Sequence, residues 1–86
     1  MNVRPAVIAA LDKTSGLLDR PSLASLALSG GDFDLSELDI DSLATYEIIM
    51  QLEDEFGIDL PPASIASTTT LCDLVDVVAR AVQAKP

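Results

Sequence analysis

The segment 42–56 constrains this chain most, because it is bounded by residues that start and end helices. Asp41 precedes it, and an aspartate there can accept hydrogen bonds from the free N–H groups of a first helical turn. Gly57 follows it and tolerates the left-handed conformation in which helices often end. One side of the predicted helix gathers a stripe that we expect to be buried: Thr45, Ile48, Ile49, Leu52 and Phe56.

Two other segments have the spacing of long helices. Residues 3–14 carry apolar side chains three and four positions apart, and Gly16 is expected to end this helix. Residues 71–84 follow Thr70, a capping residue, and Asp73 stands at the capping-box position where Glu or Gln is usual. The stripe predicted to be buried in this last helix consists of Leu71, Leu74, Val75, Val78 and Val82.

The connections between these helices carry weaker signals. Residues 62–66 predict a short helical turn near two prolines, and residues 19–31 predict either a short extra helix or a packed loop. We expect three leucines of this uncertain segment to lie on the core: Leu23, Leu26 and Leu28. The polar loop after it has four apolar anchors: Phe33, Leu35, Leu38 and Ile40. With no strand pattern, the chain predicts an all-α fold, a single domain over 1–86 that forms a small four-helix bundle with three longer helices and one short one.

The charge of the chain narrows the kind of partner. Fourteen Asp and Glu residues oppose five Lys and Arg, which gives a net charge of -9. No Lys or Arg occurs between Arg20 and Arg80, while ten of the acidic residues lie within 32–59. Nucleic acid is a poor partner for such a surface, and we expect none, because phosphate binding requires basic side chains. It favours a basic protein partner over an acidic face that serves solubility alone.

Location and assembly follow from simple absences in the sequence. The single cysteine, Cys72, cannot form an internal disulfide, and we expect it to be a partly buried, inert thiol. No apolar run approaches the roughly 18 residues of a membrane span, and no convincing signal peptide opens the chain. We therefore expect a soluble, cytoplasmic protein that is a monomer.

Enzymatic chemistry and metal binding are both disfavoured. Histidine is absent, which excludes a Ser-His-Asp triad in its usual form, and one cysteine without histidine is a poor metal site. Residues 32–43 have carboxylates at alternating positions, as a calcium loop does. However, Glu37 takes the place of the turn glycine and Leu43 that of the bidentate glutamate. The sequence predicts no catalytic residue and no metal ligand, and hence a protein that is not an enzyme.

Ser42 is then best explained as a residue that is modified and displayed. A phosphodiester at the start of a helix would meet unpaired N–H groups and the positive end of the helix dipole. The alternative is that Ser42 only helps to start the helix, as serines often do. The outward side of the same helix mixes apolar and acidic side chains, which a purely structural helix would usually avoid: Leu43, Glu47, Met50 and Asp54.

The string "LDIDSLATYEIIMQLEDEFGIDLP", residues 38–61, closely resembles the central segment of acyl carrier proteins. The string "TTTLCDLVDVV", residues 68–78, resembles their threonine-led last helix, and the resemblance covers about 35–81. It implies a carrier whose Ser42 hydroxyl receives 4'-phosphopantetheine from coenzyme A through a separate, magnesium-dependent phosphopantetheinyl transferase. The thiol of that arm, and not Cys72, would hold the cargo as a thioester.

The resemblance also assigns roles to residues around the serine. Asp41 and Leu43 flank the attachment residue in the family's motif. In this family the recognition helix docks on basic patches of partner enzymes. The expected partners are the phosphopantetheinyl transferase and the acyl-loading, synthase or transferase enzymes that act on the cargo. Five residues match this helix: Leu43, Glu47, Met50, Glu53 and Asp54.

The chain departs from the family pattern at two places in this segment. Asp39 stands where glycine is usual, and Tyr46, for which packing at the edge of the core is favoured over partner contact, replaces a smaller aliphatic residue. These departures leave partners and cargo open. The acidity favours fatty acyl or polyketide cargo over an aminoacyl or peptidyl one, and an acidic interaction module without a prosthetic group is the alternative from another class.

Overall fold

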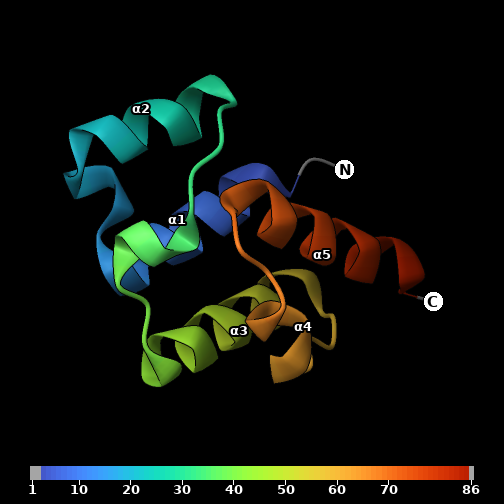
Figure 1. The fold of residues 1–86 in the computed structure, drawn as a ribbon. Helices are drawn as coiled ribbons and strands as arrows, with labels where there is room; N and C mark the ends of the chain where they lie inside the picture. Colours follow the sequence, from blue (N-terminus) through green and yellow to red (C-terminus); the bar gives the residue numbers. More distant parts are fainter. Residues whose placement is uncertain (1–2, 86) are drawn as a thin grey trace.

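The computed structural model describes residues 3–85, and its regular elements in that range are helices (Figure 1). The α-helices are α1 (Arg4–Ser15), α2 (Pro21–Ser29), α3 (Ser42–Phe56), α4 (Pro62–Ala66) and α5 (Leu71–Ala84). Two short 3₁₀ helices, η1 (Leu17–Asp19) and η2 (Leu35–Leu38), lie before and after α2. The predicted all-α bundle is confirmed, and its three long helices and one short helix correspond to α1, α3, α5 and α4.

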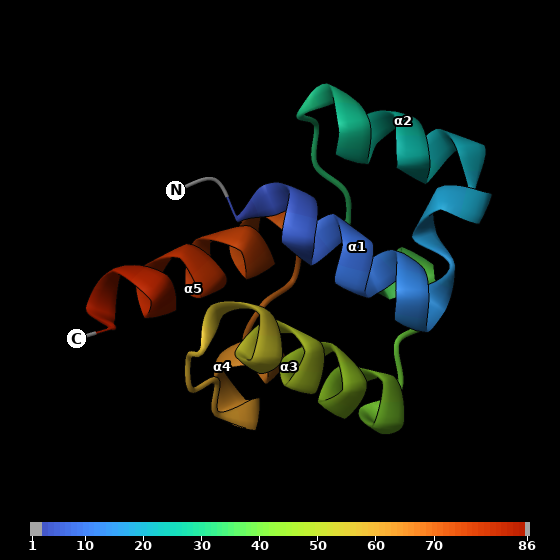
Figure 2. The same cartoon turned by 180° about the vertical axis from the view of Figure 1, so that it is seen from behind.

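The helix α1 is the centre of the bundle. In both views it runs between α2 on one side and α3 on the other, with α5 crossing near its N-terminal end (Figures 1 and 2). The most deeply buried large side chains come from η1 and from three of these helices: Val7, Leu11, Leu17, Ile48, Leu52, Leu71, Leu74 and Val78. These aliphatic contacts hold α3 and α5 against α1, so the first turn of α3 has a fixed place on the surface.

The predicted ends of α3 and α5 are confirmed. The Asp41 carboxylate accepts a hydrogen bond from the Ala44 N–H at 2.8 Å, and Gly57 ends α3 at φ 62°. At the start of α5, Thr70 and Asp73 form the reciprocal capping box, in which each side chain accepts from the other's backbone N–H. Aspartate is therefore sufficient at this position, where glutamate or glutamine is usual.

The uncertain segment 19–31 contains the helix α2, Pro21–Ser29, but its predicted burial is only partly right. Leu23 is buried, whereas Leu26 is 39% exposed and Leu28 is 71% exposed. At about 100° per residue, Leu28 lies about 140° around the helix from Leu23, so one core cannot receive both side chains. Ala27 takes the buried place beside Leu23.

The prediction of a partly buried Cys72 is wrong, because this side chain is exposed. Its neighbour Leu71 is completely buried, and the next residue on a helix points about 100° away from it. The Cys72 Sγ lies 4.0 Å from the Arg4 Nη1.

The loop before η2 is joined to the start of α5. The Leu71 N–H donates to the Phe33 carbonyl at 3.0 Å, and the Cys72 N–H donates to the Asp32 carboxylate at 2.9 Å. The bond from Cys72 is the main reason why the pKa of Asp32 lies below its ordinary value of 3.8. Asp32 thus supplements the cap of α5 from a position 40 residues away in sequence.

We expect Asp32→Asn to lower the free energy of unfolding by about 0.3–1 kcal/mol at pH 7, because the amide oxygen can still accept from the Cys72 N–H but the negative charge at the positive end of α5 is lost. Because the pKa of Asp32 is lower in the folded state, its charged form stabilises the fold above about pH 3.8. That contribution disappears as the pH falls through the folded-state pKa, so the variant and the wild type should converge in acid. Urea unfolding at pH 7 and in acid measures this. Asp34→Asn is the control, because the Asp34 side chain has no hydrogen-bond partner within residues 3–85, and an equal loss there would contradict the assignment.

Candidate functional site

Ser42 is the first residue of α3, and its side chain is exposed. The capping role that a serine could fill here belongs to Asp41, whose carboxylate already accepts from the Ala44 N–H. Within residues 3–85 the Ser42 hydroxyl has no hydrogen-bond partner. The hydroxyl is therefore accessible and is not needed by its own helix.

The backbone around Ser42 fits an anion. The N–H groups of Ser42 and Leu43 have no hydrogen-bond partner among residues 3–85, and they lie at the positive end of the α3 dipole. A negative group in such a place gains about 0.3–1 kcal/mol when exposed. The carboxylates of Asp39 and Asp41 oppose it, but both residues are exposed, and in water the repulsion between two unit charges about 4 Å apart is only about 1 kcal/mol. A phosphodiester on the Ser42 oxygen is thus compatible with the residues present.

The outward face of α3 has the mixed character that the sequence predicted. Leu43 is 68% exposed and Met50 is 59% exposed, and the acidic residues Glu47 and Asp54 are exposed on the same helix. Tyr46 is 54% exposed, which contradicts the favoured packing at the core edge and adds a third large apolar side chain on α3. Its position on the helical wheel lies between the two faces of α3. A wheel does not show whether a neighbouring helix covers that side, so the exposure of Tyr46 could not be predicted from it.

Glu53 differs from the other predicted docking residues. Its side chain is partly buried, and its Oε2 accepts a hydrogen bond from the Leu60 N–H at 2.9 Å. The carboxylate therefore holds the loop after α3 against the end of the helix. The exposed residues that we group as the candidate docking face of α3 are Leu43, Tyr46, Glu47, Met50 and Asp54.

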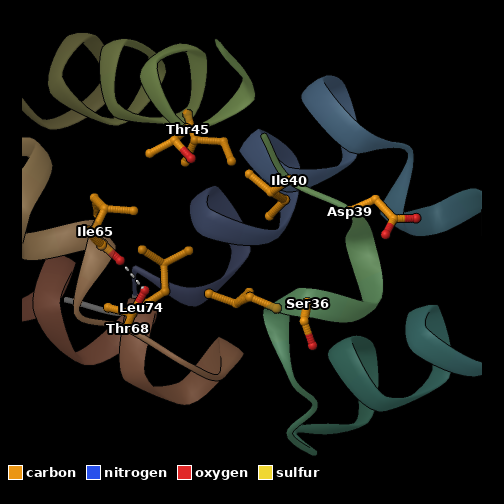
Figure 3. A pocket seen from close by; sticks show the side chains of 10 residues that line it. Ser36, Asp39, Ile40, Thr45, Ile65, Thr68 and Leu74 are labelled. Atoms are coloured by element: carbon orange, nitrogen blue, oxygen red, sulfur yellow. Dashed lines mark hydrogen bonds between the residues drawn. The ribbon is translucent and has the colours of Figure 1, made fainter. Parts of the chain in front are cut away.

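A pocket of about 400 Å³ opens beside the first turns of α3 (Figure 3). Its apolar wall comes from η2, the turn after it, α3, α4 and α5: Leu35, Ile40, Ile48, Ile65 and Leu74. In Figure 3 Ile40, Ile65 and Leu74 point towards the space, whereas the Asp39 carboxylate points away from it. Thr68 also lines the pocket, and its hydroxyl donates to the Ile65 carbonyl at 2.6 Å. The volume is in the range of small-ligand pockets, and the wall suits an apolar chain.

No group of three or more His, Cys, Asp or Glu side chains within 3–85 is arranged to hold a metal ion. In the same range, no helix has the length and apolar character needed to cross a membrane.

Comparison with known proteins gives a consistent family. The family model described as phosphopantetheine attachment site matches residues 24–78. An acyl carrier protein of Picosynechococcus sp. is 41% identical over 46 residues, which cover 54% of this chain and 57% of the relative. Acyl carrier protein 2, chloroplastic, of Spinacia oleracea is 37% identical over 57 residues, which cover 66% of this chain and 44% of the relative. The meromycolate extension acyl carrier protein of Mycobacterium leprae is 35% identical over 52 residues, which cover 60% of this chain and 45% of the relative.

The chain thus spans about half the length of the curated relatives it matches. No solved structure matches it. The family match includes η2, the Ser42 turn, α3 and α4, and it extends into α5. It covers well over half of the chain and confirms the resemblance seen in the sequence. The chain therefore belongs to the phosphopantetheine attachment-site family, and the curated relatives that it matches are acyl carrier proteins.

Proposed function

We propose that this protein carries acyl groups as thioesters on a 4'-phosphopantetheine arm attached to Ser42. The observation that supports this most directly is the exposed Ser42 hydroxyl, which is unused because Asp41 caps the helix. The family match names the prosthetic group, and the unpaired N–H groups of Ser42 and Leu43 provide a place for its phosphate.

The attachment step needs a second protein. The Ser42 oxygen would form a bond to the phosphorus of the pantetheine phosphate in coenzyme A, and 3',5'-ADP would leave. The hydroxyl proton would pass to a base of the transferase, because this sequence has no histidine, and the nearby carboxylates of Asp39 and Asp41 are exposed, with that of Asp41 already accepting from the Ala44 N–H. This chain contributes an accessible nucleophile at a fixed position and a surface on which the transferase docks.

The experiment that tests the proposal is direct. The apo protein is incubated with coenzyme A, magnesium and a broad phosphopantetheinyl transferase, and its intact mass is measured. A gain of one phosphopantetheine supports the proposal. No gain under conditions that fully modify a control carrier would overturn it.

For the cargo, the pocket beside α3 favours an acyl or polyketide chain over an aminoacyl group. Ile40 and Thr45 line this pocket and lie two and three residues from Ser42 in sequence, so an arm on Ser42 begins close to it. Its apolar wall offers little to an ammonium group, which loses hydration on burial. Partners of this cargo would be loading, synthase or transferase enzymes whose basic patches complement the acidic face of α3.

Loading an octanoyl group on the arm is expected to raise the free energy of unfolding by about 1 kcal/mol relative to a glycyl group. Each buried CH₂ contributes up to about 0.8 kcal/mol, and ordering of the flexible arm offsets part of this. Both cargoes use the same thioester, so the difference in stability reports the apolar chain of one and the ammonium group of the other. Urea unfolding of the two loaded forms measures the difference, and equal stability would contradict the pocket as the cargo site.

A further inference from the structure

Arg20 joins the start of α2 to the turn that precedes Ser42. It lies between η1 and α2, and its Nη1 donates to the Glu37 carbonyl at 2.5 Å. Its Nη2 lies 3.8 Å from the Asp39 Oδ2. The ion pair alone is weak, because the two side chains are 44% and 88% exposed. The bond to the carbonyl adds a fixed, charge-assisted contact at the end of η2.

The turn held by Arg20 has an unusual backbone. Asp39 is the one non-glycine residue of the described range with a positive φ, at 52°, in the left-handed region. Aspartate visits this region more easily than most residues, but it still gives up free energy relative to glycine there. Arg20 offsets this cost in two ways, because it binds the carbonyl two residues before Asp39 and the carboxylate of Asp39 itself.

This turn controls the approach of the chain to the serine. Asp39 is followed by Ile40, then by the capping residue Asp41, and then by Ser42. A change of backbone angle at Asp39 would therefore move the cap and the hydroxyl together. Asp39 also lines both hollows beside the site: the pocket of about 400 Å³ and a smaller one of about 250 Å³ that includes Leu43 and Glu47.

We propose that Arg20 is a positioning residue for the transfer of phosphopantetheine to Ser42, which acts by holding the turn at Asp39 in the form that the transferase receives. This inference rests on the proposed function. Arg20 would thus contribute to loading although it lies before η2 and outside the exposed face of α3. Without Arg20 the turn samples other conformations, and the transferase binds only the fraction that has the native one.

The test measures steady-state loading of the apo protein by the transferase. Arg20→Ala is expected to raise the KM for the apo protein about fivefold, equivalent to about 1 kcal/mol, with kcat nearly unchanged. We expect KM but not kcat to change, because the turn must be ordered before the transferase binds, whereas the transferase supplies the catalytic groups. Arg20→Lys, which keeps a cationic donor, should restore part of the loss.

Two controls separate positioning from charge and from direct contact. Loss of a positive charge makes the carrier more acidic, which should lower the KM towards a basic enzyme, and Arg80→Ala measures that effect at an exposed arginine paired only with Asp76 within residues 3–85. In an Asp39→Gly background the turn needs no support, since glycine adopts the left-handed region freely. There, Arg20→Ala should change the KM less than about twofold, if the whole effect passes through the turn.

The outcomes are distinct. An unchanged KM in Arg20→Ala would overturn the inference, and so would a fivefold rise that persists in the Asp39→Gly background, which would indicate direct contact between Arg20 and the transferase. Circular dichroism confirms that each variant is folded. If the wild type itself gains no phosphopantetheine, the proposed function fails, whereas a wild type that loads normally beside an unaffected Arg20→Ala removes the positioning role alone.

Discussion

Replacing Ser42 with alanine is expected to abolish loading, so that the protein shows no phosphopantetheine mass gain after full conversion of the wild type. The reason is chemical, because the substitution removes the one oxygen that forms the bond to phosphorus. The fold should be nearly unaffected. Within residues 3–85 the Ser42 hydroxyl makes no hydrogen bond, and surface changes of this kind usually alter the free energy of unfolding by less than about 0.5 kcal/mol.

Ser22→Ala is the matched control for this experiment. Ser22 is also an exposed serine in the first turn of a helix, since α2 begins at Pro21. However, α2 contains no acidic residue, so it has no face that combines acidic and apolar side chains as α3 does. It should load at the wild-type rate. A full mass gain in Ser42→Ala, or its loss in Ser22→Ala, would contradict the assignment of Ser42. Intact mass and urea unfolding of both variants give the two measurements.

The parts of this fold that were predictable are those with local causes. The start and end of α3 depend on Asp41 and Gly57, and each acts on backbone groups within four residues of itself. The capping box of Thr70 and Asp73 is local in the same way. Ser42 was therefore placed correctly at the start of its helix from sequence alone, together with the exposed faces that follow from helical geometry.

The parts that escaped prediction depend on contacts between distant segments. The Asp32 carboxylate accepts from the Cys72 N–H, and the Arg20 guanidinium donates to the Glu37 carbonyl. Neither pair has a sequence spacing that a pattern could reveal. Glu53 was expected to be a docking residue because it matches the family's recognition helix, and the sequence did not show that its carboxylate accepts from the Leu60 N–H. A carboxylate near a helix end can contact a partner protein or accept a hydrogen bond from the loop that follows. Which of the two occurs depends on the path of that loop.

Reversing the charges of Glu47 and Asp54 to lysine is expected to lower kcat/KM for loading about 100-fold, equivalent to about 2.7 kcal/mol. Both carboxylates are exposed on α3, on the face that also carries Leu43 and Met50. Against a basic patch, each reversal replaces an attraction with a like-charge contact, and such contacts cost several kcal/mol in sum. The apolar residues stay in place, so the loss reports charge on this face. Initial rates of loading at low and at high salt measure it.

The matched control carries the same change of net charge elsewhere on the molecule. Glu55 and Asp59 are exposed, and neither belongs to the docking face. Their reversal to lysine alters only the long-range electrostatic field. The loss of kcat/KM should therefore stay below about tenfold and disappear at about 1 M salt, where the Debye length is about 3 Å. Part of the loss in the Glu47 and Asp54 variant should persist there, because contacts inside an interface are shielded from ions. Equal losses in the two double variants, with equal salt dependence, would mean that the overall acidity of the chain, and not the face of α3, recruits the transferase.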